Sequence, residues 1–288
     1  IMDLVLNHSS DEHQWFKESR KSRDNPYRDY YIWKDGKNGG PPNNWKSFFG
    51  GSTWKYDERT EQYYLHLFSP KQPDLNWENP KLRQEIYDMI NWWLEKGVDG
   101  FRRGVINLIS KDQRFPDGAK SGREGYEYFA NGPRVHEFIQ EMAEKTYNNY
   151  DAMTVGETPF VDKDEALRFV KEERQEFSMV IPFNHLEFDR KDGWDKISDW
   201  KLKELKNLMS EWQYKLQENN GWTSLYFCNH DQPRIVSRYG DDGKYRKESA
   251  KMLGTMLHTL RGTPFIYQGE EIGMTNISFD SLADFDDI

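Results

Sequence analysis

Apolar and polar positions along this chain predict helices and strands in turn. Residues 80–96 carry apolar side chains three, four and seven positions apart, the spacing of one helical face. Asn79 precedes this stretch as a candidate cap, Pro80 occupies the first helical position and Gly97 follows the end. Similar patterns predict further helices at 133–147, 163–171, 201–218 and 245–260.

Six short apolar stretches alternate with these helices and predict β-strands. They are residues 1–7, 98–103, 152–157, 178–183, 223–229 and 263–269. Strands separated by helices pair in parallel through right-handed crossovers. The pattern therefore predicts an α/β fold built on a parallel sheet or barrel.

Residues 8–78 interrupt this alternation and contain no convincing helical pattern. The stretch is rich in Gly and Pro, and it carries the aromatic residues Trp15, Phe16, Trp33, Trp45, Phe48, Phe49 and Trp54. Disordered segments are poor in aromatic residues, and a long loop inside a compact domain is usually functional or a small subdomain. We therefore predict a folded insert with most of these rings in its core.

Composition excludes several classes of partner. The 288 residues carry a formal net charge of −9 without a basic stripe, which disfavours a nucleic-acid partner. No apolar run approaches the roughly 20 residues that span a bilayer, and no secretory signal is recognisable. We thus expect no membrane partner and take the cytoplasm as the default location. The single cysteine, Cys228, excludes an intramolecular disulfide.

Polar side chains gather at the C-terminal ends of the predicted strands, where barrel enzymes place their reactive groups. The first strand ends at His8, the third at Glu157 and the fifth at His230 and Asp231. The second ends at residues 102–104, which read Arg-Arg-Gly. Two carboxylates and two imidazoles at one barrel mouth suit general acid–base catalysis on a polar, neutral substrate.

Six motifs in order make the chain resemble a known family. They are DLVLNHSS at 3–10, QPDLNWENP at 72–80, GVDGFR at 97–102, TVGETP at 154–159, NHDQPR at 229–234 and GTPFIYQGEEIGM at 262–274. Together they resemble the α-amylase superfamily of glycoside hydrolases (family 13), especially its oligo-1,6-glucosidase and α-glucosidase group. The motifs cover nearly the whole chain.

This resemblance implies a partial (β/α)8 TIM barrel, in which the six strands are the third to the eighth. Residues 1–7 and 79–288 would form the partial catalytic barrel, and residues 8–78 an inserted subdomain at its mouth. The first two barrel strands and the family's C-terminal β-domain would be absent. Six strands do not close an eight-stranded barrel by themselves.

The chemistry implied by the resemblance is retaining hydrolysis of α-glucosidic bonds. By matching motifs, Glu157 is the acid/base and Asp231 stabilises the transition state. Arg102 would also orient the nucleophile and hold it ionised. Substrate-binding roles fall on His8, Arg102, His230 and Arg234.

The family's nucleophile should stand two positions after Arg102, as the Asp of a GFRMD pattern. The chain reads GFRRG, so Gly104 stands at the nucleophile position and Arg103 places a cation where an apolar residue is usual. VINLIS then continues the family pattern without insertion or deletion. Glycine has no carboxylate to form a glycosyl ester, and Asp99 lies near the other end of the strand. We therefore predict a chain that is inactive or severely impaired.

Four interpretations of Gly104 stay open. In the first, the chain is an α-glucosidase relative whose glycine is a natural loss, an engineered change or a sequence error. In the second, it is a non-catalytic sugar-binding or scaffolding relative. The third is a glycosynthase-like transferase that uses activated sugar fluorides, and the fourth is a fragment that does not fold alone. The retained Glu157, Asp231, His8 and His230 argue against the second, because a lineage freed from catalysis would lose several of them together.

The resemblance also indicates a substrate class. Val105 and Gln72 match the oligo-1,6-glucosidase pattern, so we expect α-1,6 bonds first, and α-1,4 bonds second, at the non-reducing end of short glucosides. Sucrose isomerases and trehalose-phosphate hydrolases share the framework and remain alternatives. Residues 188–194 partly resemble a loop of sucrose isomerases, but a charged turn with Gly193 is a sufficient explanation.

We expect no metal and no cofactor. His8, Asp11 and His13 fit no common zinc spacing. The expected partner is a small oligosaccharide or disaccharide, bound by a monomer.

Overall fold

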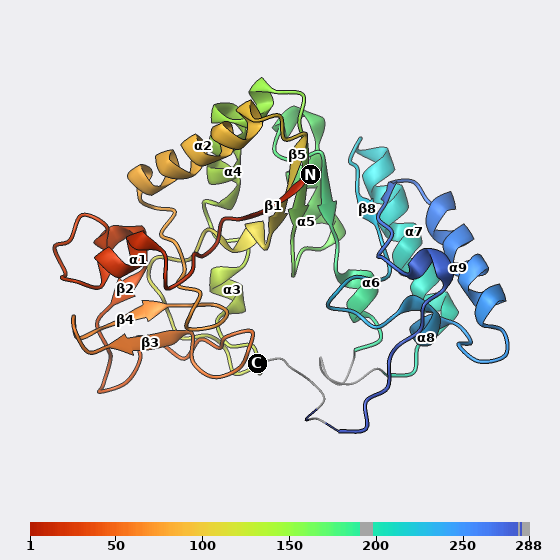
Figure 1. The fold of residues 1–288 in the computed structure, drawn as a ribbon, viewed down its shortest axis with the longest axis horizontal. Helices are drawn as coiled ribbons and strands as arrows, with labels where there is room; N and C mark the ends of the chain where they lie inside the picture. The colour runs from red at the N-terminus through yellow and green to blue at the C-terminus, as the bar shows by residue number, and fades with distance from the viewer. Residues whose placement is uncertain (191–197, 282, 284–288) are drawn as a thin grey trace. The chain divides into compact units, whose positions relative to one another are not determined.

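The computed structural model describes residues 1–190, 198–281 and 283 (Figure 1). The chain divides into two compact units, residues 1–183 with 218–221 and residues 184–217 with 222–288. Within the 188–194 stretch, residues 191–194 lie outside the described part.

The first unit contains a four-stranded parallel sheet with the order β1-β5-β6-β7. Its strands are β1 (Met2–Val5), β5 (Gly100–Gly104), β6 (Met153–Glu157) and β7 (Met179–Ile181). Val5 pairs with Gly104, and Arg103 pairs with Gly156. The register brings the C-terminal ends of the three neighbouring strands β1, β5 and β6 to the same edge, and the four strands predicted for this part of the chain are confirmed.

Helices separate these strands as predicted. They are α2 (Pro80–Glu95), α3 (Tyr126–Phe129), α4 (Val135–Lys145) and α5 (Lys163–Val170), with short 3-10 turns η2 (Ile106–Leu108), η3 (Tyr147–Asn149) and η4 (Glu172–Arg174). Asn79 caps α2 by accepting a hydrogen bond from the Lys81 amide at 2.9 Å. The face of α2 that packs inward carries Leu82, Ile86, Tyr87, Ile90 and Leu94.

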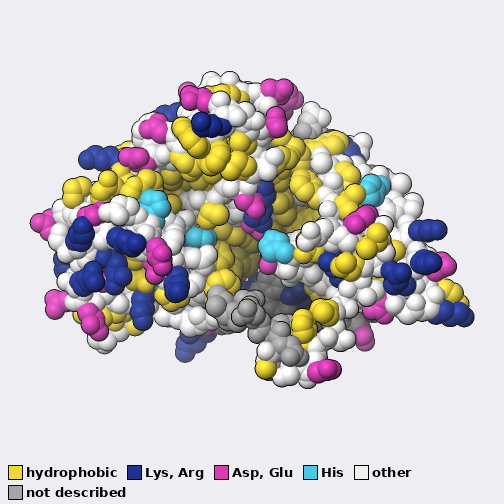
Figure 2. Space-filling view, viewed as in Figure 1, with side chains coloured by type: hydrophobic (Ala, Val, Ile, Leu, Met, Phe, Trp, Pro, Cys, Tyr) yellow, Lys and Arg dark blue, Asp and Glu magenta, His cyan; other side chains and the backbone are white. Residues whose placement is uncertain are grey.

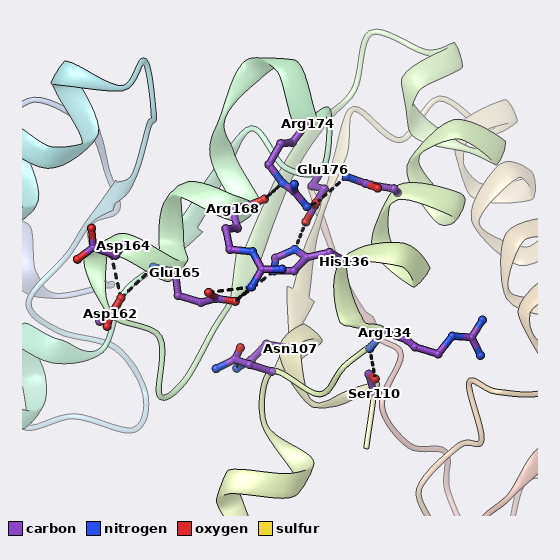
Figure 3. A network of polar contacts seen from close by, with 12 residues as sticks. Asn107, Ser110, Arg134, His136, Asp162, Asp164, Glu165, Arg168, Arg174 and Glu176 are labelled. Atoms are coloured by element: carbon purple, nitrogen blue, oxygen red, sulfur yellow. Dashed lines mark hydrogen bonds and ion pairs between the residues drawn. The ribbon is translucent and has the colours of Figure 1, made fainter. Parts of the chain in front are cut away.

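A polar network joins α4 to α5 (Figure 3). His136 of α4 contacts a carboxylate on each side of its ring, with Nδ1 2.7 Å from Glu176 Oε2 and Nε2 3.2 Å from Glu165 Oε1. Arg168 and Arg174 contact the same carboxylates at 3.1 and 2.5 Å, respectively. The imidazole is buried, so these contacts replace the water that a charged ring would otherwise need.

Residues 8–78 form a separate antiparallel sheet with the order β2-β4-β3. Its strands are β2 (Trp33–Lys34), β3 (Trp54–Asp57) and β4 (Gln62–Leu65), and η1 (Arg28–Tyr30) precedes them. The expectation of no helix here was wrong, because α1 (Gln14–Ser19) lies in this stretch. Six residues are too few to display a periodic apolar face, and the helix is instead started by His13, whose ring accepts from the Trp15 amide.

The aromatic residues of this insert share part of their hydrophobic core with residues outside it. Trp45, Trp54 and Leu65 pack in one cluster with Phe115 and Phe129, which follow β5 in the chain. Phe49 is exposed, whereas Phe16 is fully buried. The insert therefore depends on the segment after β5 for part of its hydrophobic core, and its role as a subdomain at a barrel mouth stays a prediction.

The second unit also pairs strands in parallel, with β8 (Ser224–Leu225) beside β9 (Thr263–Pro264). Both strands are shorter than predicted. Its helices are α6 (Asn184–Glu187), α7 (Leu202–Glu218), α8 (Ile235–Tyr239) and α9 (Arg246–Thr259), followed by η5 (Glu270–Ile272). Leu205, Phe227 and Leu253 are among the residues of its apolar core. A buried ion pair between Arg238 and Asp189, with Nε 2.9 Å from Oδ2, ties α8 to the end of α6.

The helices of the described residues are all too short or too polar to cross a membrane.

Candidate functional site

Gly104 and Arg102 lie two positions apart on β5, so both positions face the same side of the sheet. Arg102 Nη2 lies 2.9 Å from Glu157 Oε1 at the end of the neighbouring strand β6. The Val105 amide donates to Glu157 Oε2 at 2.9 Å. Glu157 is only 8% exposed, so this carboxylate is held by a cation and an amide in a largely dry place.

The backbone of Gly104 would accept a side chain. Its φ lies outside the left-handed region, and a Cβ built there would lie 3.4 Å from Arg102 Nη1 and 3.5 Å from Glu157 Oε2, with no other non-neighbouring atom within 4 Å. These are ordinary or slightly tight contacts. The position at the strand end is thus sterically open, and it lies beside one guanidinium and one carboxylate.

Arg102 contacts a second carboxylate, because its Nη1 lies 3.2 Å from Asp3 Oδ1 on β1. Asp3 is mostly exposed, whereas Glu157 is buried. Ion pairs gain more where water is excluded, so the contact with Glu157 is the stronger of the two. Val105, the residue after Gly104, has a φ of 43°, which is unusual for a β-branched side chain.

Arg103 faces the opposite side of β5, where the sheet is covered. It is 0% exposed, and its guanidinium lies 4.1 Å from the ring centre of Tyr147 and 5.2 Å from that of Phe177. None of its three side-chain nitrogens has a hydrogen-bond partner within the described part of the chain. Burial lowers the pKa of the Arg103 guanidinium, and Tyr147 offsets this only in part. The surroundings of residue 103 would therefore suit an apolar side chain.

His8 lies just past the end of β1, next to the insert. Its Nε2 is 3.1 Å from the Gln72 side-chain nitrogen, and its ring packs against Phe68 with the ring centres 5.2 Å apart. Burial lowers the pKa of His8, Asp74 raises it and Lys111 lowers it, so the net effect favours the neutral imidazole. A neutral ring keeps one nitrogen free to accept a hydrogen bond.

The remaining predicted residues lie in the second unit, in the loop that follows β8. His230 Nε2 is 3.3 Å from Asp231 Oδ2, and both side chains are well exposed. The Asp231 amide donates to Asn229 Oδ1 at 2.8 Å, which shapes the turn. Arg234 donates to the Gln268 carbonyl at 2.6 Å and stacks on Tyr267.

The predicted residues thus fall into three local groups. Arg102, Gly104 and Glu157 are in mutual reach, His8 lies at the end of the adjacent strand, and residues 230–234 form a group in the second unit. Among the described residues, no cluster of three or more His, Cys, Asp or Glu side chains has the geometry of a metal site.

Sequence reasoning missed a buried polar triad beside His8. Lys111 Nζ lies 2.8 Å from Asp74 Oδ2 and 2.9 Å from Asn7 Oδ1, and Asn7 Nδ2 lies 3.0 Å from Asp74 Oδ2. All three side chains are almost completely buried. The one available signal was a lysine at the end of the apolar stretch VINLIS, since a buried lysine is rare unless it is paired.

Comparison with known proteins identifies the family of this chain. The model described as "Alpha amylase, catalytic domain" matches residues 1–288. An oligo-1,6-glucosidase of Parageobacillus thermoglucosidasius is 61% identical over 294 aligned residues, which cover 100% of this chain and 52% of that protein. The chain therefore spans about half the length of the curated relatives it matches.

Solved structures agree. A mutant trehalose-6-phosphate hydrolase of Bacillus licheniformis in complex with PNG has a TM-score of 0.96 and 52% identity, over 100% of this chain and 52% of that one. An inactive double mutant of the trehalulose synthase MutB in complex with isomaltulose has a TM-score of 0.94 and 46% identity, over 99% of this chain and 52% of that one. The parallel strands and helices of the chain are part of a TIM barrel, and the chain belongs to the α-amylase family of glycoside hydrolases.

Proposed function

We propose that this chain derives from a retaining α-glucosidase and has lost the group that begins the reaction. Members of its family act on α-glucosides, as the names of its relatives indicate. A retaining glycosidase uses one carboxylate to attack the anomeric carbon and a second carboxyl group to protonate the leaving oxygen. Here Glu157 takes the second role, and residue 104 is the place of the first.

The geometry at Gly104 carries this proposal. The position lies beside Arg102 and Glu157, accepts a Cβ and presents no carboxylate. Without a nucleophile no glycosyl-enzyme forms. A loss on the order of 10⁵-fold in rate corresponds to about 7 kcal/mol of barrier.

The contact between Arg102 and Glu157 also works against catalysis. An ion pair stabilises the carboxylate form of Glu157, whereas protonation of a leaving oxygen requires the neutral carboxyl group. An aspartate at position 104 would compete for Arg102, because its Cβ would already lie 3.4 Å from Nη1. Restoring the nucleophile thus also weakens the hold of Arg102 on the acid/base.

For the substrate, we propose short α-glucosides cleaved at their non-reducing end, with α-1,6 bonds first and α-1,4 bonds second. The oligo-1,6-glucosidase relative, at 61% identity, supports this choice, as do Gln72 and Val105. Trehalose 6-phosphate hydrolysis and sucrose isomerisation remain alternatives, because a trehalose-6-phosphate hydrolase and an isomaltulose synthase in complex with sucrose match 100% and 99% of this chain. Asp231, His230 and Arg234 take transition-state and substrate-binding roles in each case.

A non-catalytic, sugar-binding role is the second candidate. The inactive double mutant of MutB was crystallised with isomaltulose, so a relative of this fold holds a sugar without turning it over. Loss of the side chain at residue 104 leaves His8, Glu157 and Arg102 in place.

The test restores the expected pair of residues. The chain is joined to the flanking regions of the Parageobacillus thermoglucosidasius relative, and Gly104→Asp is combined with Arg103→Met. We expect hydrolysis of an aryl α-glucoside to rise by about 10⁵-fold over the unmodified chimera, because the nucleophile is again present. The restored variant is then compared on isomaltose, maltose, trehalose 6-phosphate and sucrose to identify the substrate.

The matched control is Gly104→Asn with Arg103→Met, which has the size of aspartate but cannot form the glycosyl ester. It should stay inactive. Hydrolysis by the unmodified chimera at the rate of the relative itself would sink the proposal, as would an inactive aspartate variant that is correctly folded.

A further inference from the structure

The buried triad of Asn7, Asp74 and Lys111 closes a ring between three distant parts of the chain. Asn7 follows β1, Asp74 lies in the insert, and Lys111 follows η2 after β5. Each pair in the triad is in contact at 2.8–3.0 Å, and the Leu67 amide donates to the remaining Asp74 oxygen at 2.9 Å. Lys111 is 1% exposed, so its charge is compensated by Asp74 and Asn7 instead of by water.

The backbone around the triad leads directly to His8. His8 forms a β-bridge with Asp74, and the Leu75 amide donates to the Asn7 carbonyl at 2.8 Å. The Ser9 amide donates to the Pro73 carbonyl at 3.2 Å. These bonds hold the segment that carries Gln72 antiparallel to the end of β1, and Gln72 in turn contacts the His8 ring.

We propose that Lys111 is a positioning residue for His8: its buried ammonium group holds Asp74 and Asn7 together, and so fixes the Gln72 segment and the His8 ring at the end of β1. This proposal rests on the proposed function and deepens it, because it concerns a histidine whose expected role is to bind the sugar. Lys111 itself is buried and acts only through Asp74 and Asn7. Its role is therefore geometric and electrostatic.

Asp74 and Lys111 carry opposite charges, so removing one or the other should shift the pKa of His8 in opposite directions. A general loss of stability would not produce this pair of shifts. Asp74 raises the pKa of His8 and Lys111 lowers it, on top of the lowering by burial. Lys111→Met should therefore raise the pKa of His8, and Asp74→Asn should lower it further. A purely structural role would lower the unfolding temperature in both variants without moving the two pKa values in opposite directions.

The experiment is a nuclear magnetic resonance titration of His8 in the chimera with the flanking regions of the oligo-1,6-glucosidase relative, and it requires no enzymatic activity. The pKa of His8 and the contact between its ring and the Gln72 side chain are measured in the wild type, Lys111→Met, Asp74→Asn and the double variant. The double variant removes both the Lys111 ammonium and the Asp74 carboxylate, so no unpaired charge stays buried. It should therefore fold even if one of the single variants does not. We expect its His8 ring to lose the ordered Gln72 contact.

Arg174→Met is the matched control, because Arg174 pairs with the buried Glu176 at 2.5 Å between α5 and β7, in the same unit but in none of the segments that the triad joins. It should lower stability and leave His8 unchanged. An unaltered ring environment and Gln72 contact in the double variant would overturn the proposal. So would His8 pKa values that move in the same direction in the two single variants. Because no sugar is used, these outcomes are separate from failure of the proposed function.

Discussion

Arg103 and Gly104 are neighbours in the chain, but their positions face opposite sides of β5. Gly104 faces Arg102 and Glu157, where the proposed chemistry takes place. Arg103 is buried among Tyr147 and Phe177 with its nitrogens unpaired within the described residues. A change at 104 should therefore act on catalysis, and a change at 103 on stability.

Arg103→Met alone should stabilise the chain. Methionine fills an apolar pocket without burying hydrogen-bond donors that lack acceptors, and each such donor costs about 1–3 kcal/mol. We expect the free energy of unfolding to rise by roughly 1–3 kcal/mol in urea denaturation. The same variant should leave the activity of the chimera at its low level, since Glu157 and Arg102 are not altered.

Arg103→Lys serves as the control, because it keeps a buried charge and should bring no such gain. A lower stability of the methionine variant would contradict this prediction. In that case the stacking of the guanidinium on Tyr147 would outweigh the cost of its unpaired donors.

At the scale of elements, the His136 network should make the packing of α4 against α5 depend on pH. Burial lowers the pKa of His136, but its contacts with Glu165 and Glu176 outweigh burial and raise it above the ordinary value of 6.5. The contact with His136, followed by those with Arg168, lowers the pKa of Glu165 below 4.5, although burial opposes this. Both shifts favour the charged imidazolium between charged carboxylates.

The sign of the pH dependence follows from these two directions. His136 contributes its full stability below pH 6.5, and this is lost as pH rises through its raised pKa in the folded chain. Glu165 contributes stability above pH 4.5, and this is lost as pH falls through its lowered pKa. The network is therefore most stabilising between about pH 4.5 and 6.5.

Chemical denaturation of the wild type and of His136→Gln across pH 4 to 9 checks this prediction. The stability difference between them should be largest near pH 6 and should shrink as pH rises above 6.5. Arg134 lies two residues before His136, and its side chain is partly exposed. It provides a control, because Arg134→Gln should lower stability without this profile. A difference between wild type and His136→Gln that is constant from pH 6 to 9 would show that His136 is neutral in the folded chain.

At the scale of the whole molecule, each unit has an apolar cavity and exposed apolar side chains. A cavity of about 730 Å³ lies between β1 and α2, with Leu6, Ile86 and Met89 in its wall, and Val5 of β1 is 53% exposed. Apolar side chains gather over α2 on the face shown in Figure 2. In the second unit, a cavity of about 690 Å³ adjoins α9, and Ile272 is 66% exposed.

Exposed apolar surface of this kind should bind a hydrophobic fluorescent dye. We expect the chain by itself to bind such a dye, and the chimera with the flanking regions of the oligo-1,6-glucosidase relative to bind far less, because those regions accompany this one in proteins about twice as long. Dye titration and the cooperativity of thermal unfolding measure the effect. Weak binding and sharp unfolding of the chain alone would contradict the interpretation that it does not fold well alone.

Much of this architecture follows from local pattern. The bounds of α2 were predicted within one residue from its helical periodicity, the Asn79 cap and the Pro80 start. Each of the six apolar stretches contains a strand. These features depend on interactions within a few residues, so the sequence displays them directly. The glycine at the proposed nucleophile position was likewise visible from the unbroken motif around Gly104.

Other features depend on contacts between distant segments. The pairing of Arg102 with Glu157 arises because β5 lies in register beside β6, and the Lys111 triad joins residues up to 104 positions apart. The insert shares its core with Phe115 and Phe129, which no local pattern indicates. The sequence by itself determined the order of strands and helices, the family and the glycine at the proposed nucleophile position. Only the tertiary structure decided which charges pair and which are left unpaired, because pairing depends on strand register and burial.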